Sequence, residues 1–374
     1  MIKIKKLFFF FILISCKSLV VKGAVIQGNL GSLQRNLSEK EIEIKDPNGY
    51  TLLMEATARG NLNIVNYLIS RNANVNTQNK FGETPSIVAS IKRFKEILES
   101  LIKANANINI KDREGRSPLM YAAIYGYKDI AELLISKGAF IDDRSKTGET
   151  PVMFAAMNGR IDVLNLLIAS KANLNLKDNS AWNALSLAIS YNQFEATEVL
   201  LKNNIDINMV DEDGLTALID TAKHNKLKLL ELLIRYKAPL NSLDKDGRSA
   251  LIFATEKNHQ DAITILAQAG ANKEQTDIYG RTPLIIAVRN GHYEATEALL
   301  REKCEVDAKD NFGTTSLMWS VYLGNKKMVE LLLKKNANPR RQNREGFTAL
   351  DYAKGKNNHE IIQILEYALN GGNK

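Results

Sequence analysis

A chain of 374 residues with 45 % apolar residues has enough apolar side chains for a buried core, and two cysteines are too few for a disulfide framework. The formal net charge of +8 is concentrated at one end, because five lysines before residue 25 carry five of these eight charges and leave +3 for the rest. The net charge of +3 that remains for residues 25–374 is small, which argues against a nucleic-acid partner.

The chain begins with the pattern of a secretory signal. Lys3, Lys5 and Lys6 precede an apolar run over residues 7–14, which fits the core of a signal peptide and is shorter than the roughly 20 residues that span a bilayer. Residues 13–16, Leu-Ile-Ser-Cys, resemble the lipobox of bacterial lipoproteins, in which the cysteine becomes the lipidated N-terminal residue. We therefore expect a signal peptide over residues 1–16, lipidation of Cys16, and a lipid-anchored protein of the bacterial cell envelope.

Ordinary signal cleavage between Ser18 and Ala24 is the alternative, and it would leave a soluble periplasmic or secreted protein. Lys22 before Gly23 and Ala24 fits poorly the small residues that such cleavage prefers, so lipidation is favoured.

From residue 47 onwards the chain repeats itself every 33 residues. A glycine recurs on this grid at positions 49, 82, 115, 148, 214, 247, 280, 313 and 346, and Ala181 fills the one remaining place. After each grid position comes an apolar segment, such as Gly-Arg-Thr-Pro-Leu-Ile-Ile-Ala over residues 280–287, and then a second one, such as Ile-Ala-Glu-Leu-Leu-Ile over residues 130–135. A fixed period of this length predicts an array in which each repeat buries its apolar face against the next.

Each repeat is predicted to form two short helices. The Ser or Thr after the grid glycine can cap the first helix, and the Pro that often follows is tolerated in its first turn. A Gly or Asn marks the end of this helix, where the left-handed conformation is needed. The second helix carries Leu and Ile at spacings of three and four residues, which gives it one apolar stripe.

These residues resemble the ankyrin repeats, whose pattern runs Asp-x-x-Gly-x-Thr-Pro-Leu-x-x-Ala, then Gly-His, Val-x-x-Leu-Leu and Gly-Ala-x-x-Asn. The resemblance covers residues 47–370 and implies an all-α repeat solenoid of ten stacked helix-turn-helix units with turn or β-hairpin tips. The family's His two residues after Pro is replaced by Met, Ile, Ser or Asp in every repeat. We expect the lost hydrogen bond to be compensated by packing.

The two ends of the array depart from the pattern. The last repeat has polar residues on a face that would otherwise be stacked, so it is interpreted as a capping repeat, followed by a tail over residues 371–374. Residues 24–30 resemble residues 56–62, which predicts a tether and a degenerate half-repeat over residues 17–46.

The fifth repeat is the most irregular one. It lacks both the Gly and the Thr-Pro, and Ala181 stands at the grid position. If that position requires a positive φ, Ala181 weakens the array there by about 1 kcal/mol.

No pattern in the sequence predicts catalysis, a metal site or a cofactor. His259 and His292 stand at the Gly-His position of consecutive repeats, about 10 Å apart if the helices stack at normal distance, which is too far for one metal ion. We expect each to form a local hydrogen bond instead. Cys304 replaces a small alanine of other repeats, so we expect it to be buried. An enzyme, a bound cofactor and a small-molecule substrate are therefore not expected.

The resemblance implies that a partner protein binds in a concave groove formed by the tips and the first helices. Exposed aromatic and Arg side chains contribute most of the binding energy at protein interfaces. Those expected at the tips and on the first helices are, with the favoured pair first, Trp182, Tyr191, Tyr125, Tyr279, Arg281, Tyr322, Phe81 and Phe312. The alternative for each tip aromatic is that it packs only on the adjacent tip.

The sequence thus predicts a non-catalytic scaffold for protein–protein interaction, anchored to the cell envelope through Cys16. The alternative is a secreted effector or toxin-like protein that binds proteins of a host or a competitor.

Overall fold

The structure, a computed structural model, describes residues 17–371. The expected signal peptide and Cys16 lie outside the described residues. The chain divides into two compact units, Met1–Asn179 and Ser180–Lys374, and each is described by itself. The regular structure within residues 17–371 is helical, and the only β pairing there consists of three isolated bridges between the two sides of hairpin tips. The predicted all-α repeat solenoid is therefore confirmed.

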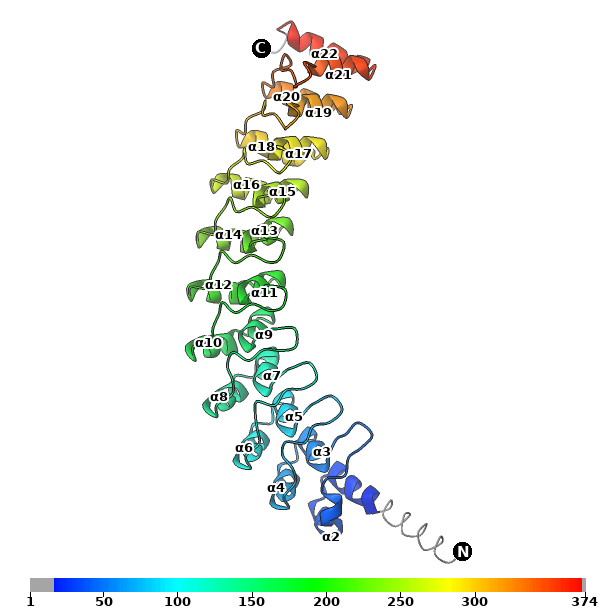
Figure 1. The fold of residues 1–374 in the computed structure, drawn as a ribbon, viewed down its shortest axis with the longest axis vertical. Helices are drawn as coiled ribbons and strands as arrows, with labels where there is room; N and C mark the ends of the chain where they lie inside the picture. The colour runs from blue at the N-terminus through cyan, green and yellow to red at the C-terminus, as the bar shows by residue number, and fades with distance from the viewer. Residues whose placement is uncertain (1–16, 372–374) are drawn as a thin grey trace, which may run out of the picture. The chain divides into compact units, whose positions relative to one another are not determined.

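In the first unit, successive helix pairs stack side by side (Figure 1). A helix over residues 17–26, α2 (Leu30–Asn36) and the 3-10 helix η1 (Glu39–Glu41) come first. The first helices of the pairs are α3 (Leu52–Ala58), α5 (Pro85–Ile91), α7 (Pro118–Tyr125) and α9 (Pro151–Met157). The second helices are α4 (Leu62–Ser70), α6 (Lys95–Lys103), α8 (Lys128–Ser136) and α10 (Ile161–Ala169). Like helices contact each other, α3 with α5, α5 with α7, and α7 with α9.

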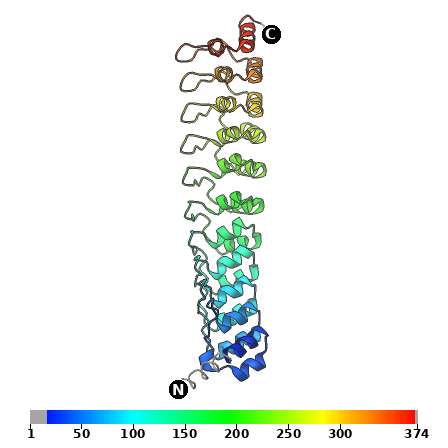
Figure 2. The ribbon, with the colours of Figure 1, turned by 90° about the vertical axis from the view of Figure 1, so that its right-hand side faces the viewer.

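The second unit is built in the same way. Its first helices are α11 (Ala184–Ser190), α13 (Ala217–Lys223), α15 (Ala250–Glu256), α17 (Pro283–Arg289), α19 (Ser316–Tyr322) and α21 (Ala349–Gly355). Its second helices are α12 (Phe194–Lys202), α14 (Leu227–Arg235), α16 (Gln260–Gln268), α18 (Tyr293–Arg301), α20 (Lys326–Lys334) and α22 (His359–Leu369). Figure 2 shows the hairpin tips of this unit projecting on one side of the helix pairs. No helix in residues 17–371 has the length and apolar character needed to cross a bilayer.

The ends of the first helices follow the sequence signals. Thr216 accepts a hydrogen bond from the backbone N–H of Ile219 at 3.2 Å, which caps the start of α13. The helix is followed by Asn225 with φ 54°, and every Gly or Asn predicted to end a first helix has a positive φ. The sequence did not suggest Arg93 for this role, yet its φ is 58°. The local chemistry of the repeat therefore defines its helices.

The structure corrects one sequence expectation about hydrogen bonds and adds to another. His259 and His292 do bond through Nδ1, but the partners are Ala222 O and Thr255 O of the preceding helix pair, both at 3.1 Å, so these bonds join consecutive pairs. Methionine at the family's His position also keeps part of the lost bond, because Met120 Sδ lies 3.4 Å from the Ser117 N–H.

The core lies between the two helices of each pair and between neighbouring pairs. In α8, Ile130, Ala131 and Leu134 are fully buried, as the predicted stripe requires. Cys304 is buried as expected, and burial raises the pKa of its thiol to about 12. Loss of one such leucine would cost about 2–5 kcal/mol, so burial stabilises the stack far more than any surface ion pair.

The irregular grid position Ala181 adopts a left-handed conformation with φ 63°, as the grid glycines do. We expect Ala181→Gly to stabilise the second unit by about 1 kcal/mol, because glycine reaches this region without a steric penalty. The melting temperature should rise by about 2–4 °C. Ala188→Gly in the middle of α11 is the control and should lower it, because glycine is unfavourable inside a helix. A lower melting temperature for Ala181→Gly would contradict the prediction.

Candidate functional site

Most hairpin tips have a carboxylate or amide three residues before the grid position, and Ser145 is the exception. Asp277 Oδ1 accepts hydrogen bonds from the backbone N–H groups of Tyr279 and Arg281, both at 2.9 Å. Asn79 and Asn343 make the same two bonds at the equivalent position of their tips. Each such tip is therefore a rigid turn, and it places the residues on either side of the grid position at the surface.

Aromatic side chains are exposed at several tips. Phe312 is 68 % exposed, and Phe81, Tyr279 and Phe347 are also classed as exposed. Exposed large aromatic residues at fixed positions are candidates for contact with a partner. Tyr50, at another tip, is only half-buried, and its hydroxyl donates to Glu83 at 2.8 Å. Burial and this carboxylate raise the pKa of Tyr50 to about 12.

The ends of the first helices carry a second set of exposed tyrosines. Tyr125, Tyr191 and Tyr322 are exposed, as the sequence predicts for these positions. In the first unit, Tyr125 stacks on Tyr121 and Tyr127 with ring centroids 6.4 and 5.5 Å apart. The guanidinium carbon of Arg93 lies 5.3 Å from the Tyr127 ring centroid, so a cation covers one end of this stack.

The last helix pairs of the second unit bring four aromatic rings together. Tyr322 lies edge-on to Trp319 and to Tyr352, at centroid distances of 5.8 and 6.2 Å, and Phe347 lies 6.3 Å from Tyr352. Arg289 lies over Trp319 and Lys356 over Tyr322, both at 4.4 Å. We call Arg289, Trp319, Tyr322, Phe347, Tyr352 and Lys356 the aromatic cluster. It is partly exposed and cationic at its rim, which suits a partner with aromatic or acidic groups.

The sequence analysis missed Trp319 and Tyr352. Both stand six residues after a grid glycine, whereas the aromatic residues predicted from the sequence stand at the tips or at the ends of the first helices. The same position holds Tyr121, Phe154 and Phe253. The recurrence of aromatic residues at this spacing could have identified Trp319 and Tyr352 from the sequence.

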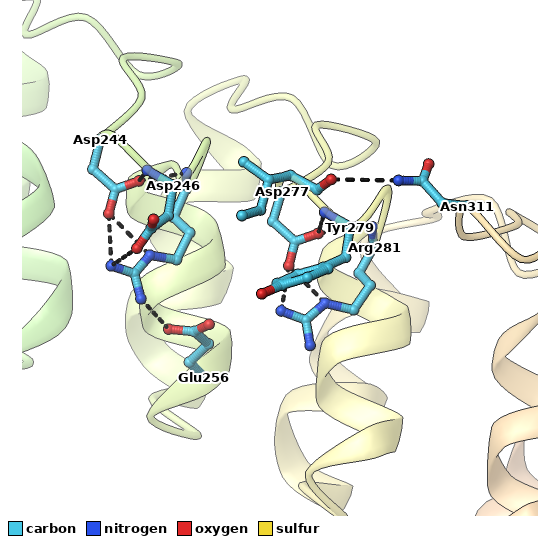
Figure 3. Close-up of polar contacts among 9 residues, drawn as sticks. Asp244, Asp246, Glu256, Asp277, Tyr279, Arg281 and Asn311 are labelled. Atoms are coloured by element: carbon cyan, nitrogen blue, oxygen red, sulfur yellow. Dashed lines mark hydrogen bonds and ion pairs between the residues drawn. The ribbon is translucent and has the colours of Figure 1, made fainter.

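Arg281 was expected to be exposed, but its guanidinium is bound within its own tip. Its Nε lies 2.6 Å from Asp277 Oδ2, and its side chain is only 22 % exposed (Figure 3). The guanidinium carbon also lies 4.7 Å from the centroid of the Tyr279 ring. One helix pair earlier, Arg248 binds Asp244 in the same way and reaches Asp246 and Glu256 (Figure 3). Arg281 thus stabilises the tip, which leaves the exposed Tyr279 ring as the part that can contact a partner.

Trp182 was also expected to be exposed, and it is half-buried. It lines a cavity of about 380 Å³ in the second unit, together with residues of α11, α13 and the tip between them, among them Ser186, Asp211, Asp213 and His224. Tyr191 is 55 % exposed but does not line this cavity, so the two residues of the favoured pair do not share one site.

The described residues contain no group of His, Cys, Asp or Glu side chains arranged to hold a metal ion. The tips and the ends of the first helices thus combine exposed aromatic rings, Arg and Lys side chains that lie over such rings, and rigid turns.

Comparison with protein families agrees with this geometry. A family model described as ankyrin repeats, in three copies, matches residues 22–112, 53–145, 140–211, 185–277, 218–310 and 284–371. A comparison with curated proteins found no match. The matched segments together extend over both compact units.

Proposed function

The chain belongs to the ankyrin-repeat family, and from this premise we propose that it is a non-catalytic scaffold that binds a partner protein through its tips and first helices. Ankyrin repeats generally mediate protein–protein interaction. The observation that carries the proposal is the set of exposed rings at these positions, above all Tyr191, Phe312 and Tyr322. One of these residues, Tyr322, belongs to the aromatic cluster, where rings and cationic side chains are already in contact.

Photo-crosslinking in the producing cells tests this proposal. A crosslinkable residue placed singly at Tyr191, Phe312 or Tyr322 should give one discrete protein adduct, identified by mass spectrometry. Tyr367 is the matched control, since it is an exposed tyrosine on α22, a second helix, away from the tips. The same adduct at Tyr367, or no adduct at any of the three sites in a folded protein, would contradict the proposal.

We also propose that the scaffold is exported and anchored by lipid at Cys16. The lysines and apolar run before Leu-Ile-Ser-Cys support this, and the prediction is a loss of incorporated labelled fatty acid in Cys16→Ala. Loss of the acyl chains should also move the protein from the envelope fraction to the soluble fraction. Label that survives in Cys16→Ala would contradict lipidation. Wild-type protein that lacks label and appears in the medium would favour the secreted effector instead.

A further inference from the structure

The turn carboxylate Asp211 differs from its counterparts in the second unit. At the next three tips the second carboxylate oxygen receives a side-chain donor, Arg248 Nε for Asp244 at 2.9 Å, Arg281 Nε for Asp277 at 2.6 Å, and Trp319 Nε1 for Asp310 at 2.9 Å. The tip of Asp211 has Leu215 in place of the arginine and Asp220 in place of the tryptophan. Within residues 17–371, Asp211 receives hydrogen bonds only from backbone N–H groups.

The cavity of about 380 Å³ lies at this tip. It is lined by Asp211 and Leu215, where the other tips place their own donor, and by Trp182 from the preceding repeat. Ser186 also lines it, at the position that holds Ile219 in the next repeat, so a smaller side chain helps to leave the space open.

Lys223 and His224 also line the cavity, and within residues 17–371 neither is paired with Asp211 or Asp213. Lys226 and His224 contact the carboxylate of Asp220 at 3.2 and 3.0 Å, and Lys223 Nζ lies 5.6 Å from the Phe253 ring centroid. No ion pair of Asp211 or Asp213 exists within the described part of the chain, so the wall they form retains its negative charge.

We propose that this cavity receives an arginine side chain of the partner protein, which would bind Asp211 and lie against the indole of Trp182. The proposal rests on the proposed scaffold function and specifies the chemistry of its partner. The chain itself contains the same interaction twice: Arg281 binds Asp277 and lies over the Tyr279 ring (Figure 3). Arg248 binds Asp244, and its guanidinium carbon lies 4.4 Å from the Phe253 ring centroid. A planar guanidinium satisfies a carboxylate and stacks on an aromatic face at once, which an ammonium group does less well.

The direct test uses a pentapeptide with one central arginine flanked by glycines and capped at both ends. The chain has two tryptophans, so the indole N–H signal of Trp182 can be assigned by its loss in Trp182→Phe. The arginine peptide should shift this signal saturably. The same peptide with citrulline, which has the shape of arginine without its charge, should bind at least about tenfold more weakly.

Two variants and a control place the binding at Asp211. Asp211→Asn should weaken binding of the arginine peptide at least about tenfold while the tip stays folded, because Asn79 and Asn343 already serve at this turn position. Leu215→Arg should abolish binding by supplying the missing guanidinium from the chain, as Arg248 and Arg281 do in their tips. Asp46→Asn, the same change in a tip of the first unit, should leave the affinity unchanged.

Equal affinity for the arginine and citrulline peptides, or full affinity in both cavity variants, would overturn the inference. A protein adduct at Tyr322 that persists in Leu215→Arg, without any response of Trp182 to the peptide, would also overturn it and would leave the scaffold function standing. A response to arginine without any protein adduct would support the cavity and contradict the scaffold.

Discussion

Asp277→Ala is expected to destabilise the second unit by about 3 kcal/mol. The Asp277 side chain is 1 % exposed. Its carboxylate accepts hydrogen bonds from the backbone N–H groups of Tyr279 and Arg281 and binds the Arg281 guanidinium. Removing one partner of a buried ion pair costs about 3–5 kcal/mol, because the other charge is left without compensation. The lower end applies here, since Arg281 is 22 % exposed and can turn towards water.

Asp277→Asn separates the two contributions of this carboxylate. Asparagine should keep both backbone hydrogen bonds, as Asn343 does at the equivalent position, and lose only the charge that binds Arg281. Urea unfolding of the two variants should therefore show a smaller loss for Asn than for Ala, by about 1–2 kcal/mol. Equal losses would mean that the ion pair alone stabilises the tip. No loss in either variant would show that the turn forms without the carboxylate.

The helices and their ends could be predicted from the sequence because they depend on neighbours in the chain. Thr216 caps α13 through a hydrogen bond to a residue three positions later, and Asn225 adopts the left-handed conformation just after the helix. Residues of the same types recur at these positions in other repeats, so the same local interactions recur. Arg93 is an exception, since its positive φ is imposed by its place in the repeat and not by its own preference.

The exposure of individual aromatic and arginine residues could not be predicted in the same way. Phe312 and Trp182 both flank a grid position, yet one is 68 % exposed and the other lines a cavity. The difference arises from side chains of other repeats and from donors within the tip, as with Arg281 on Asp277. A pattern that averages over repeats contains no information on these individual contacts.

At several tips, the neighbouring tip lies so close that there is no room for a side chain at the grid glycine. Gly313 has φ 75°, and a Cβ added there would lie 2.8 Å from the backbone N of Arg344 in the next tip. The Arg344 N–H donates to Phe312 O at 3.0 Å, so the next tip cannot move away without loss of this hydrogen bond. Gly313→Ala is therefore expected to cost about 3 kcal/mol, of which about 1 kcal/mol is the conformational penalty of a positive φ.

Gly346→Ala is the matched control in the same unit and at the same grid position. Gly346 has φ 85°, but a Cβ there would meet no atom within 4 Å, so only the conformational penalty of about 1 kcal/mol applies. Urea unfolding of the two variants should thus differ by about 2 kcal/mol, which measures the contact between neighbouring tips. Equal losses would show that backbone conformation alone requires glycine, and that the tips tolerate a wider spacing than the structure has. A loss confined to Gly313→Ala would instead mean that the left-handed conformation costs little in this turn, and then Ala181 would not weaken its repeat.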